Sequence, residues 1–253
     1  MLPVAPSNLR TLDFILMAIL LAALPLWGHF VVTPWRRKRL AAGTFDPIQA
    51  YVRSLVMLWG LVLLLAIDWW LVGREPKALG LIVHPDFLFM AGCLFAAVIM
   101  AVFVWQAFKI RRLDPERKRK IIAKNPGVFE IIPSTPKQLR WFVGLSVSAG
   151  VTEELLYRGF LIWALSAYMD LLMAAVLASV LFGLAHAYQG VAGILKTGAI
   201  GLVMATLYIG SGTILLPMLL HAFMDISSGF VSYSLKSEQG AGSLSSSTPL
   251  RSA

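Results

Sequence analysis

Residues 141–165 read WFVGLSVSAGVTEELLYRGFLIWAL and carry two adjacent glutamates and an arginine inside an otherwise apolar run. A membrane-spanning helix needs about 20 mostly apolar residues, so this run is long enough to cross a bilayer. Ionisable side chains within a bilayer cost about 2.5–3.5 kcal/mol each on insertion scales. Three of them in one span therefore predict a polar site inside a membrane helix bundle.

Further apolar stretches lie on both sides of this run. Three follow it with only a few residues between them, at residues 168–187, 191–210 and 213–233, and such short connections force neighbouring helices to run antiparallel. Three more precede it, at residues 14–32, 54–72 and 87–108. The first exceeds the apolar core of a signal peptide, roughly 7–15 residues, so we expect a helix there. The sequence predicts an all-α fold, a polytopic transmembrane bundle of about seven to eight helices.

Composition supports this fold class. Hydrophobic residues make up 58% of the 253 residues and charged residues 14%, whereas soluble domains average about half and a quarter. These values exclude a disordered chain and an ordinary soluble domain. The single cysteine, Cys93, excludes an intrachain disulfide and a cysteine-rich metal site. The net charge of +9 comes from short basic runs between apolar stretches, which favours membrane topology over a nucleic-acid partner.

The basic runs also predict an orientation. Lys and Arg are dense at residues 36–39 and 109–140 and sparse at residues 73–86. Because basic loops stay on the cytoplasmic side, the first and third loops are predicted to be cytoplasmic. We expect a multi-pass protein of a bacterial plasma (inner) membrane, with its active site accessible from the cytoplasmic side or from lipid.

The chain divides into four predicted regions. Residues 1–112 form a three-helix transmembrane region, 113–136 a polar, basic cytoplasmic linker, 137–234 a four-helix core, and 235–253 a flexible tail. The linker is interpreted as a solvated loop, with a basic amphipathic surface helix as the alternative. Pairs of small residues four apart predict close helix contacts in the core; these pairs are Gly144 with Ser148, Ser179 with Gly183, and Gly201 with Ala205.

Helix geometry sorts the ionisable residues of the core. Glu154 and Arg158 are four apart, share one face and can pair. Glu153 lies about 100° round the helix, which leaves it without an intrahelical cation. By itself it could be a second partner for Arg158 or a protonated group in an interhelical hydrogen bond. His221 and Asp225 share a face, so the aspartate could fix the tautomer of the imidazole.

Three short motifs occur in order on three apolar stretches. They are EELLYR at residues 153–158, FGLAH at 182–186 and HAFMD at 221–225. They match the patterns EExxxR, FxxxH and HxxxN or HxxxD. The segment from residue 137 to 233 thus resembles the CPBP membrane proteases, the CAAX-prenyl-protease and bacteriocin-processing group that is also called the Abi family. The first three apolar stretches carry no motif of this group.

This resemblance implies an intramembrane endopeptidase that hydrolyses membrane-anchored or lipidated peptides with a glutamate-activated water. By motif position, Glu153 is the general base, and His186 assists it and shuttles the proton. His221 and Asp225 line the oxyanion site. Glu154, Arg158 and Phe182 are supporting residues.

One motif position departs from the prenyl-protease branch, where the third motif usually ends in Asn. An ionised Asp225 accepts hydrogen bonds but cannot donate one to an oxyanion. It is therefore either protonated, or it keeps His221 cationic so that the imidazolium stabilises the charge.

Alternative functions and mechanisms follow from the same residues. Zinc is the rival to a cofactor-free mechanism, with Glu153, His186 and His221 as a His₂Glu ligand set. A non-catalytic scaffold or immunity protein on the same fold is the second function, which an altered motif would favour. A proton-coupled transporter is the third, but it predicts inverted repeats that the sequence lacks.

Overall fold

Polar residues and glycines at the ends of the apolar stretches set where the helices begin and end. The computed structural model describes residue 6 and residues 9–124 and 131–245, and these ranges contain helices and no strand. Asp46 and Asp86 accept hydrogen bonds from backbone N–H groups in the first turns of helices α4 (Pro47–Val72) and α5 (Phe87–Arg111). Asp170 does the same for helix α10 (Leu171–Ala185). Gly73 follows α4 in the left-handed conformation, φ 70°, that ends a helix without steric cost.

The first membrane helix runs from Thr11 to Ala41. Two π-helical segments interrupt it, so it consists of α1 (Thr11–Ala18), η1 (Ile19–Ala23), α2 (Leu24–Trp27), η2 (Gly28–Val32) and α3 (Thr33–Ala41). Four elements lie between this helix and the core: α4 (Pro47–Val72), η3 (Pro76–Leu79), α5 (Phe87–Arg111) and α6 (Pro115–Lys124).

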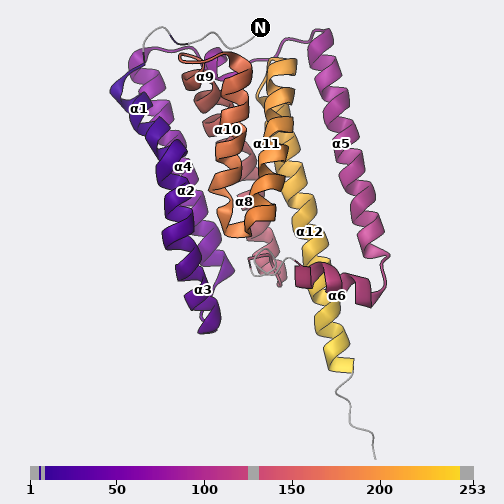
Figure 1. Ribbon diagram of the computed structural model, residues 1–253. Helices are drawn as coiled ribbons and strands as arrows, with labels where there is room; N and C mark the ends of the chain where they lie inside the picture. Colours follow the sequence, from indigo (N-terminus) through magenta and orange to yellow (C-terminus); the bar gives the residue numbers. More distant parts are fainter. Residues whose placement is uncertain (1–5, 7–8, 125–130, 246–253) are drawn as a thin grey trace, which may run out of the picture.

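The second half of the chain begins with one continuous helix of three segments, α8 (Pro136–Glu154), η4 (Leu155–Leu161) and α9 (Ile162–Leu165). The remaining elements are α10 (Leu171–Ala185), η5 (Ala187–Gln189), α11 (Val191–Ser211) and α12 (Leu215–Ser245). Successive long helices run in opposite directions (Figure 1). The predicted all-α transmembrane bundle is confirmed.

Five of the described helices are long and apolar enough to span a membrane: the helix at 11–41, α4, α5, α11 and α12. The other two expected spans exist as helices but fall outside this set. Helix α10 has 15 residues. The helix of α8, η4 and α9 carries Glu153, Glu154 and Arg158 within its length. The protein is a multi-pass membrane protein.

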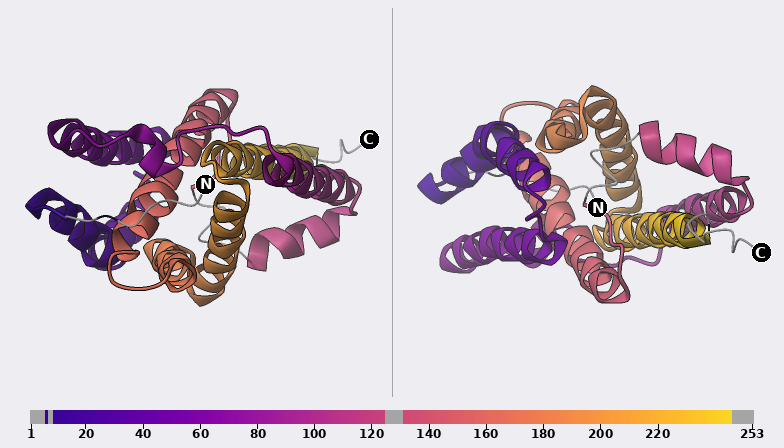
Figure 2. Two further views of the ribbon diagram at one scale, coloured as in Figure 1. Left: turned by 90° about the horizontal axis from the view of Figure 1, so that it is seen from above. Right: turned by 90° about the horizontal axis from the view of Figure 1, so that it is seen from below.

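The α8 helix lies in the middle of the bundle. It packs against α4 on one side and α12 on the other, and α5 packs on α12 and α11 at the far side (Figure 2). The first three membrane helices therefore flank the core on two sides. A buried apolar cluster that includes Leu20, Leu65, Phe160 and Phe182 joins the first two of them to the core.

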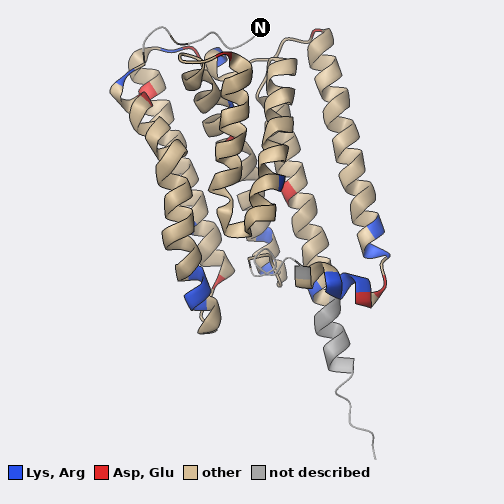
Figure 3. Ribbon diagram, viewed as in Figure 1, with Lys and Arg blue, Asp and Glu red and all other residues tan. Residues whose placement is uncertain are grey.

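Lys and Arg gather at one end of the bundle, at the ends of α3 and α5, on α6 and at the start of α8 (Figure 3). Both predicted cytoplasmic loops thus lie at the same end. We call this end the basic face. That it faces the cytoplasm stays a prediction.

The expectation of a solvated loop was wrong for part of the 113–136 linker. Residues 115–124 form α6, which lies across the basic face (Figure 1). Ile121 and Ile122 pack beside Leu235 of α12 and Ile132, so apolar burial orders this basic segment. Residues 125–130 of the linker lie outside the described residues. The expected flexible tail, 235–253, begins within α12, which continues to Ser245; residues 246–253 are outside the described part.

Two of the three predicted small-residue contacts are confirmed. A Cβ on Gly183 would lie 2.6 Å from the Ile194 carbonyl of α11, and one on Gly201 would lie 3.4 Å from Ser179 Cα. The prediction for Gly144 was wrong, because a Cβ there would meet nothing within 4 Å. The close contact of α8 comes instead at Gly150, where a Cβ would lie 2.8 Å from Ala222 N and 2.9 Å from Met218 O of α12.

We expect Gly150→Ala to destabilise the protein by about 1–3 kcal/mol, since the added methyl group forces α8 away from α12. Gly144→Ala on the same helix is the matched control. It should be neutral or stabilising by up to about 1 kcal/mol, because alanine favours the helix and space is open there. Unfolding in mixed micelles of rising SDS content measures both. Equal effects of the two substitutions would contradict the close contact at Gly150.

Candidate active site

Glu154 and Arg158 form a buried ion pair at the site. The Arg158 guanidinium Nη1 donates to Glu154 Oε1 at 2.8 Å, and the two side chains are 1% and 0% exposed. Arg158 Nη2 donates to the Gly201 carbonyl of α11 at 3.1 Å, and Arg158 Cζ lies 4.3 Å from the centroid of the Phe182 ring. The predicted pairing within EELLYR is confirmed, and it also ties η4 to α10 and α11.

Glu154 reaches a second helix through His221. His221 Nδ1 lies 2.7 Å from the same Oε1 that accepts from Arg158. A carboxylate oxygen accepts only, so Nδ1 carries the proton and the other ring nitrogen, Nε2, faces away from Glu154. The expectation that Asp225 fixes this tautomer was wrong, because the residue that bonds to the imidazole is Glu154. Asp225 Oδ2 is 3.7 Å from Nε2, beyond hydrogen-bond range.

Glu153 lies on the other side of the imidazole. Its Oε2 is 3.9 Å from His221 Nε2, and its side chain is 16% exposed, in contrast to the fully buried Glu154. The two adjacent glutamates therefore face different surroundings, as helix geometry predicted. Glu154 is held by two partners, Arg158 and His221, whereas the side chain of Glu153 is partly exposed.

His186 enters from a third helix. It ends α10, and its Nδ1 lies 2.8 Å from the Phe182 carbonyl, an acceptor, so Nδ1 carries the proton and Nε2 remains to act. The Phe182 ring lies beside both histidines, with ring centroids 4.8 Å from His186 and 6.0 Å from His221. Phe182 thus separates the two imidazoles and covers Arg158.

The predicted site residues of three helices therefore meet in one place. Glu153 interacts electrostatically with His186, His221 and Asp225. The side chain of Asp225 is 44% exposed and lies at the rim.

Residues 135–227 match the family model described as Type II CAAX prenyl endopeptidase Rce1-like. We call this segment the Rce1-like domain. It contains all three motifs and every catalytic and supporting residue predicted above. A comparison with curated proteins finds no match, and neither does one with solved structures.

Sequence reasoning missed two tyrosines of the Rce1-like domain. Tyr157, a spacer position of EELLYR, is 3% exposed and packs edge-on against Phe182 with centroids 5.1 Å apart. Tyr188 follows His186 in η5, with ring centroids 5.7 Å apart. Aromatic residues within and just after a motif are the only signal that could have found them.

A residue outside the Rce1-like domain supports the loop after His186. Arg36 of α3 donates from Nη2 to the Tyr188 carbonyl at 3.2 Å, and its Cζ lies 5.5 Å from the Tyr188 ring centroid. Arg36 is only 7% exposed, although it belongs to the basic run at residues 36–39 that predicts the orientation of the protein in the membrane. The first membrane helix thus contributes to the position of η5.

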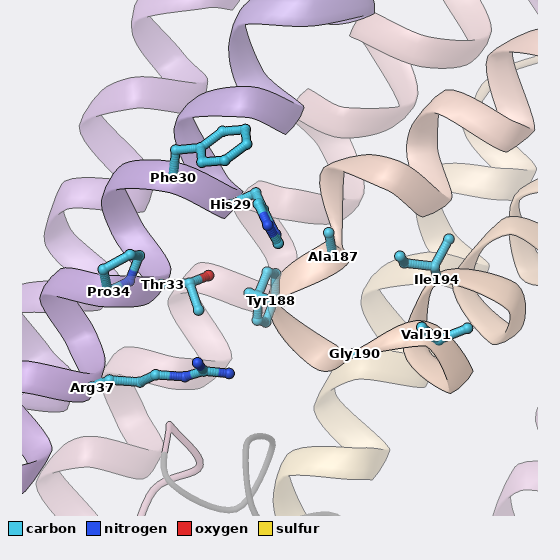
Figure 4. A pocket seen from close by; sticks show the side chains of 10 residues that line it. All are labelled: His29, Phe30, Thr33, Pro34, Arg37, Ala187, Tyr188, Gly190, Val191 and Ile194. Atoms are coloured by element: carbon cyan, nitrogen blue, oxygen red, sulfur yellow. The ribbon is translucent and has the colours of Figure 1, made fainter.

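A pocket of about 380 Å³ lies between that helix and η5 (Figure 4). His29, Thr33 and Arg37 form one wall, and Tyr188 and Ile194 lie on the other. It adjoins the segment that begins at His186 and provides space beside the domain.

His186 and His221 share a feature of zinc-binding histidines. Each histidine has only Nε2 to offer, and a backbone carbonyl or carboxylate on Nδ1 is typical of histidines that bind zinc. The placement does not complete a site, however, since no three His, Cys, Asp or Glu side chains lie close enough to hold an ion within the described ranges.

Proposed function

We propose that the Rce1-like domain hydrolyses peptide bonds of membrane-anchored or lipidated peptides, with Glu153 as the base that activates water. The observation that supports this most strongly is that the two adjacent glutamates differ in their partners and in their exposure. Arg158 and His221 both bond to Glu154, which leaves Glu153 as the partly exposed carboxylate, 3.9 Å from His221 Nε2 and in electrostatic interaction with His186.

Peptide hydrolysis needs a base for the attacking water, an acid for the leaving amine and donors for the oxyanion. In the proposed reaction, Glu153 takes a proton from a water molecule as the water oxygen attacks the carbonyl carbon of the peptide bond. His186, whose Nε2 is unprotonated, accepts that proton from Glu153 and delivers it to the leaving nitrogen, as the oxyanion returns to a carbonyl and the carbon–nitrogen bond breaks. A protonated His221 donates from Nε2 to the oxyanion, and Glu154 on its other nitrogen favours that protonated form.

This assignment gives Asp225 a supporting role. At 3.7 Å from His221 Nε2, an ionised Asp225 favours the imidazolium by charge rather than by a hydrogen bond. It would repel an oxyanion in direct contact, so we place the donation in His221. The substitution of Asp for the more usual Asn is then compatible with hydrolysis.

Cleavage of membrane-anchored reporter peptides, prenylated and not, by the full-length protein in liposomes tests the proposal. Wild type, His186→Ala and the matched control His84→Ala, an exposed loop histidine, are compared with and without a chelator. We expect His84→Ala to cleave like wild type and His186→Ala to lose about 10²-fold or more, with the chelator having no effect.

Other outcomes would redirect the mechanism or the function. Loss of cleavage in chelator that zinc restores would assign the reaction to a metal on Glu153, His186 and His221. Equal activity of wild type and His186→Ala would remove that histidine from the mechanism. Cleavage of no peptide at all by a folded wild-type protein would favour the non-catalytic scaffold.

A further inference from the structure

A second pocket, of about 460 Å³, lies in the furrow between α8 and α4, which pack against each other. Lys137, Arg140, Trp141, Gly144 and Ser148 of α8 line it, and Leu55 of α4 forms the facing wall. We call it the α4–α8 groove. The proposed peptidase reaction uses none of its residues.

The lining residues change in character along the groove. Lys137 and Arg140 are exposed and stand one turn apart at the start of α8. The start of α8 belongs to the basic face (Figure 3). Neither is in an ion pair with any residue in the described ranges. Trp141, 41% exposed, comes next, at the level where tryptophan marks a membrane interface.

Deeper along α8 the groove is lined by two small residues. Gly144 and Ser148 follow Arg140 at four-residue spacing, so they continue the same helix face. A Cβ on Gly144 would meet nothing within 4 Å, which shows that this part of the furrow is open rather than filled by a neighbouring helix. A small-residue pair that sequence rules assign to helix packing thus faces empty space.

A phospholipid has this same order of features: an anionic phosphate at the interface and an acyl chain extending into the hydrocarbon. Basic pockets between membrane helices bind anionic headgroups, and the open space beside Gly144 leaves room for an acyl chain. We propose that the α4–α8 groove binds an anionic phospholipid, with its phosphate on Lys137 and Arg140 and one acyl chain along Gly144 and Ser148.

The purified full-length protein, titrated with dioleoyl phosphatidylglycerol or dioleoyl phosphatidylcholine in neutral detergent, tests this by native mass spectrometry. Wild type should bind the anionic lipid more tightly than the neutral one. The double variant Lys137→Gln/Arg140→Gln should weaken anionic-lipid binding roughly 25-fold, since each basic residue contributes about fivefold. Arg111→Gln/Arg112→Gln, which removes two charges elsewhere on the basic face, is the matched control and should bind like wild type.

The chain part of the groove is tested separately. Gly144→Leu fills the furrow without a change of charge and should weaken binding of the phosphatidylglycerol, whereas Gly60→Leu, at an exposed glycine of α4 with open space, should not. Melting temperatures in phosphatidylcholine establish that each variant is folded.

Three results would overturn the proposal. Equal weakening by the control pair would assign binding to the diffuse charge of the basic face. Displacement of the lipid by inorganic phosphate at similar concentration, with Gly144→Leu unaffected, would make the site a free-phosphate site. Equal affinity of wild type for the two lipids would show that the groove does not select charge.

Discussion

Replacing Glu153 by glutamine should lower the rate of peptide cleavage by about 10³-fold, because an amide of the same shape cannot take the proton of the attacking water. The melting temperature should change little. Glu153 is partly exposed, and its nearest ionic contact, His221 Nε2 at 3.9 Å, is longer than a hydrogen bond. Loss of its charge therefore removes no bond that holds the fold.

Glu154→Gln is the informative comparison, since it changes the adjacent residue in the same way. Glu154 bonds to both Arg158 and His221, so its neutralisation should lower stability and activity together. Kinetics in liposomes and SDS-induced unfolding, measured on both variants, separate the two roles. A Glu153→Gln protein that retains more than a tenth of wild-type activity would contradict the assignment of the base.

Local geometry explains which parts of this site the sequence could predict. Glu154 and Arg158 pair because four residues bring two side chains to one helix face, and this holds even though η4 follows Glu154 directly as a π-helical segment. The different facing of Glu153, about 100° round the helix, follows from the same geometry. The three motifs likewise located His186 and His221 on their helices before any packing was known.

Contacts between helices could not be predicted in this way. His221 Nδ1 bonds to Glu154, 67 residues away, and not to Asp225, which shares its helix. The choice depends on the distance between α8 and α12, which Gly150 sets by letting the backbones approach. A spacing rule identifies the residues that can meet on one helix, but it carries no information about the neighbouring helix.

Charge patterns were similarly incomplete. Arg36 lies in a basic run that predicts topology, yet it is buried against Tyr188, 152 residues away. Lys137 and Arg140 belong to the same class of residue and stay exposed beside a groove. The sequence pattern predicts that all three residues lie at one face of the membrane. Which of them is buried and which exposed depends on how α3 and α4 pack against the core.

Arg158→Ala should destabilise the protein by about 3–5 kcal/mol, the second large effect that the structure predicts. Removing one partner of a buried pair leaves the other charge without compensation. Glu154 is fully buried, and its Oε2 already has no hydrogen-bond partner among the described residues. SDS-induced unfolding of wild type and variant measures the cost.

The matched control is an ion pair of the same spacing in a different environment. Lys120 Nζ lies 2.7 Å from Glu116 Oε1 on α6, with side chains 68% and 78% exposed. Lys120→Ala should cost no more than about 0.5 kcal/mol, because water screens and replaces the exposed pair. A comparable cost for the two substitutions would show that burial is not the source of the Arg158 effect.

The double variant Glu154→Gln/Arg158→Met separates the energy of the pair from the penalty of an unpaired charge. If the large cost of Arg158→Ala arises from a stranded carboxylate, removing that carboxylate as well should recover part of the stability. Activity should not recover, since glutamine at residue 154 cannot favour the protonated form of His221 as a carboxylate does. A double variant that regains both would show that the pair serves the fold alone and that His221 needs no anionic partner.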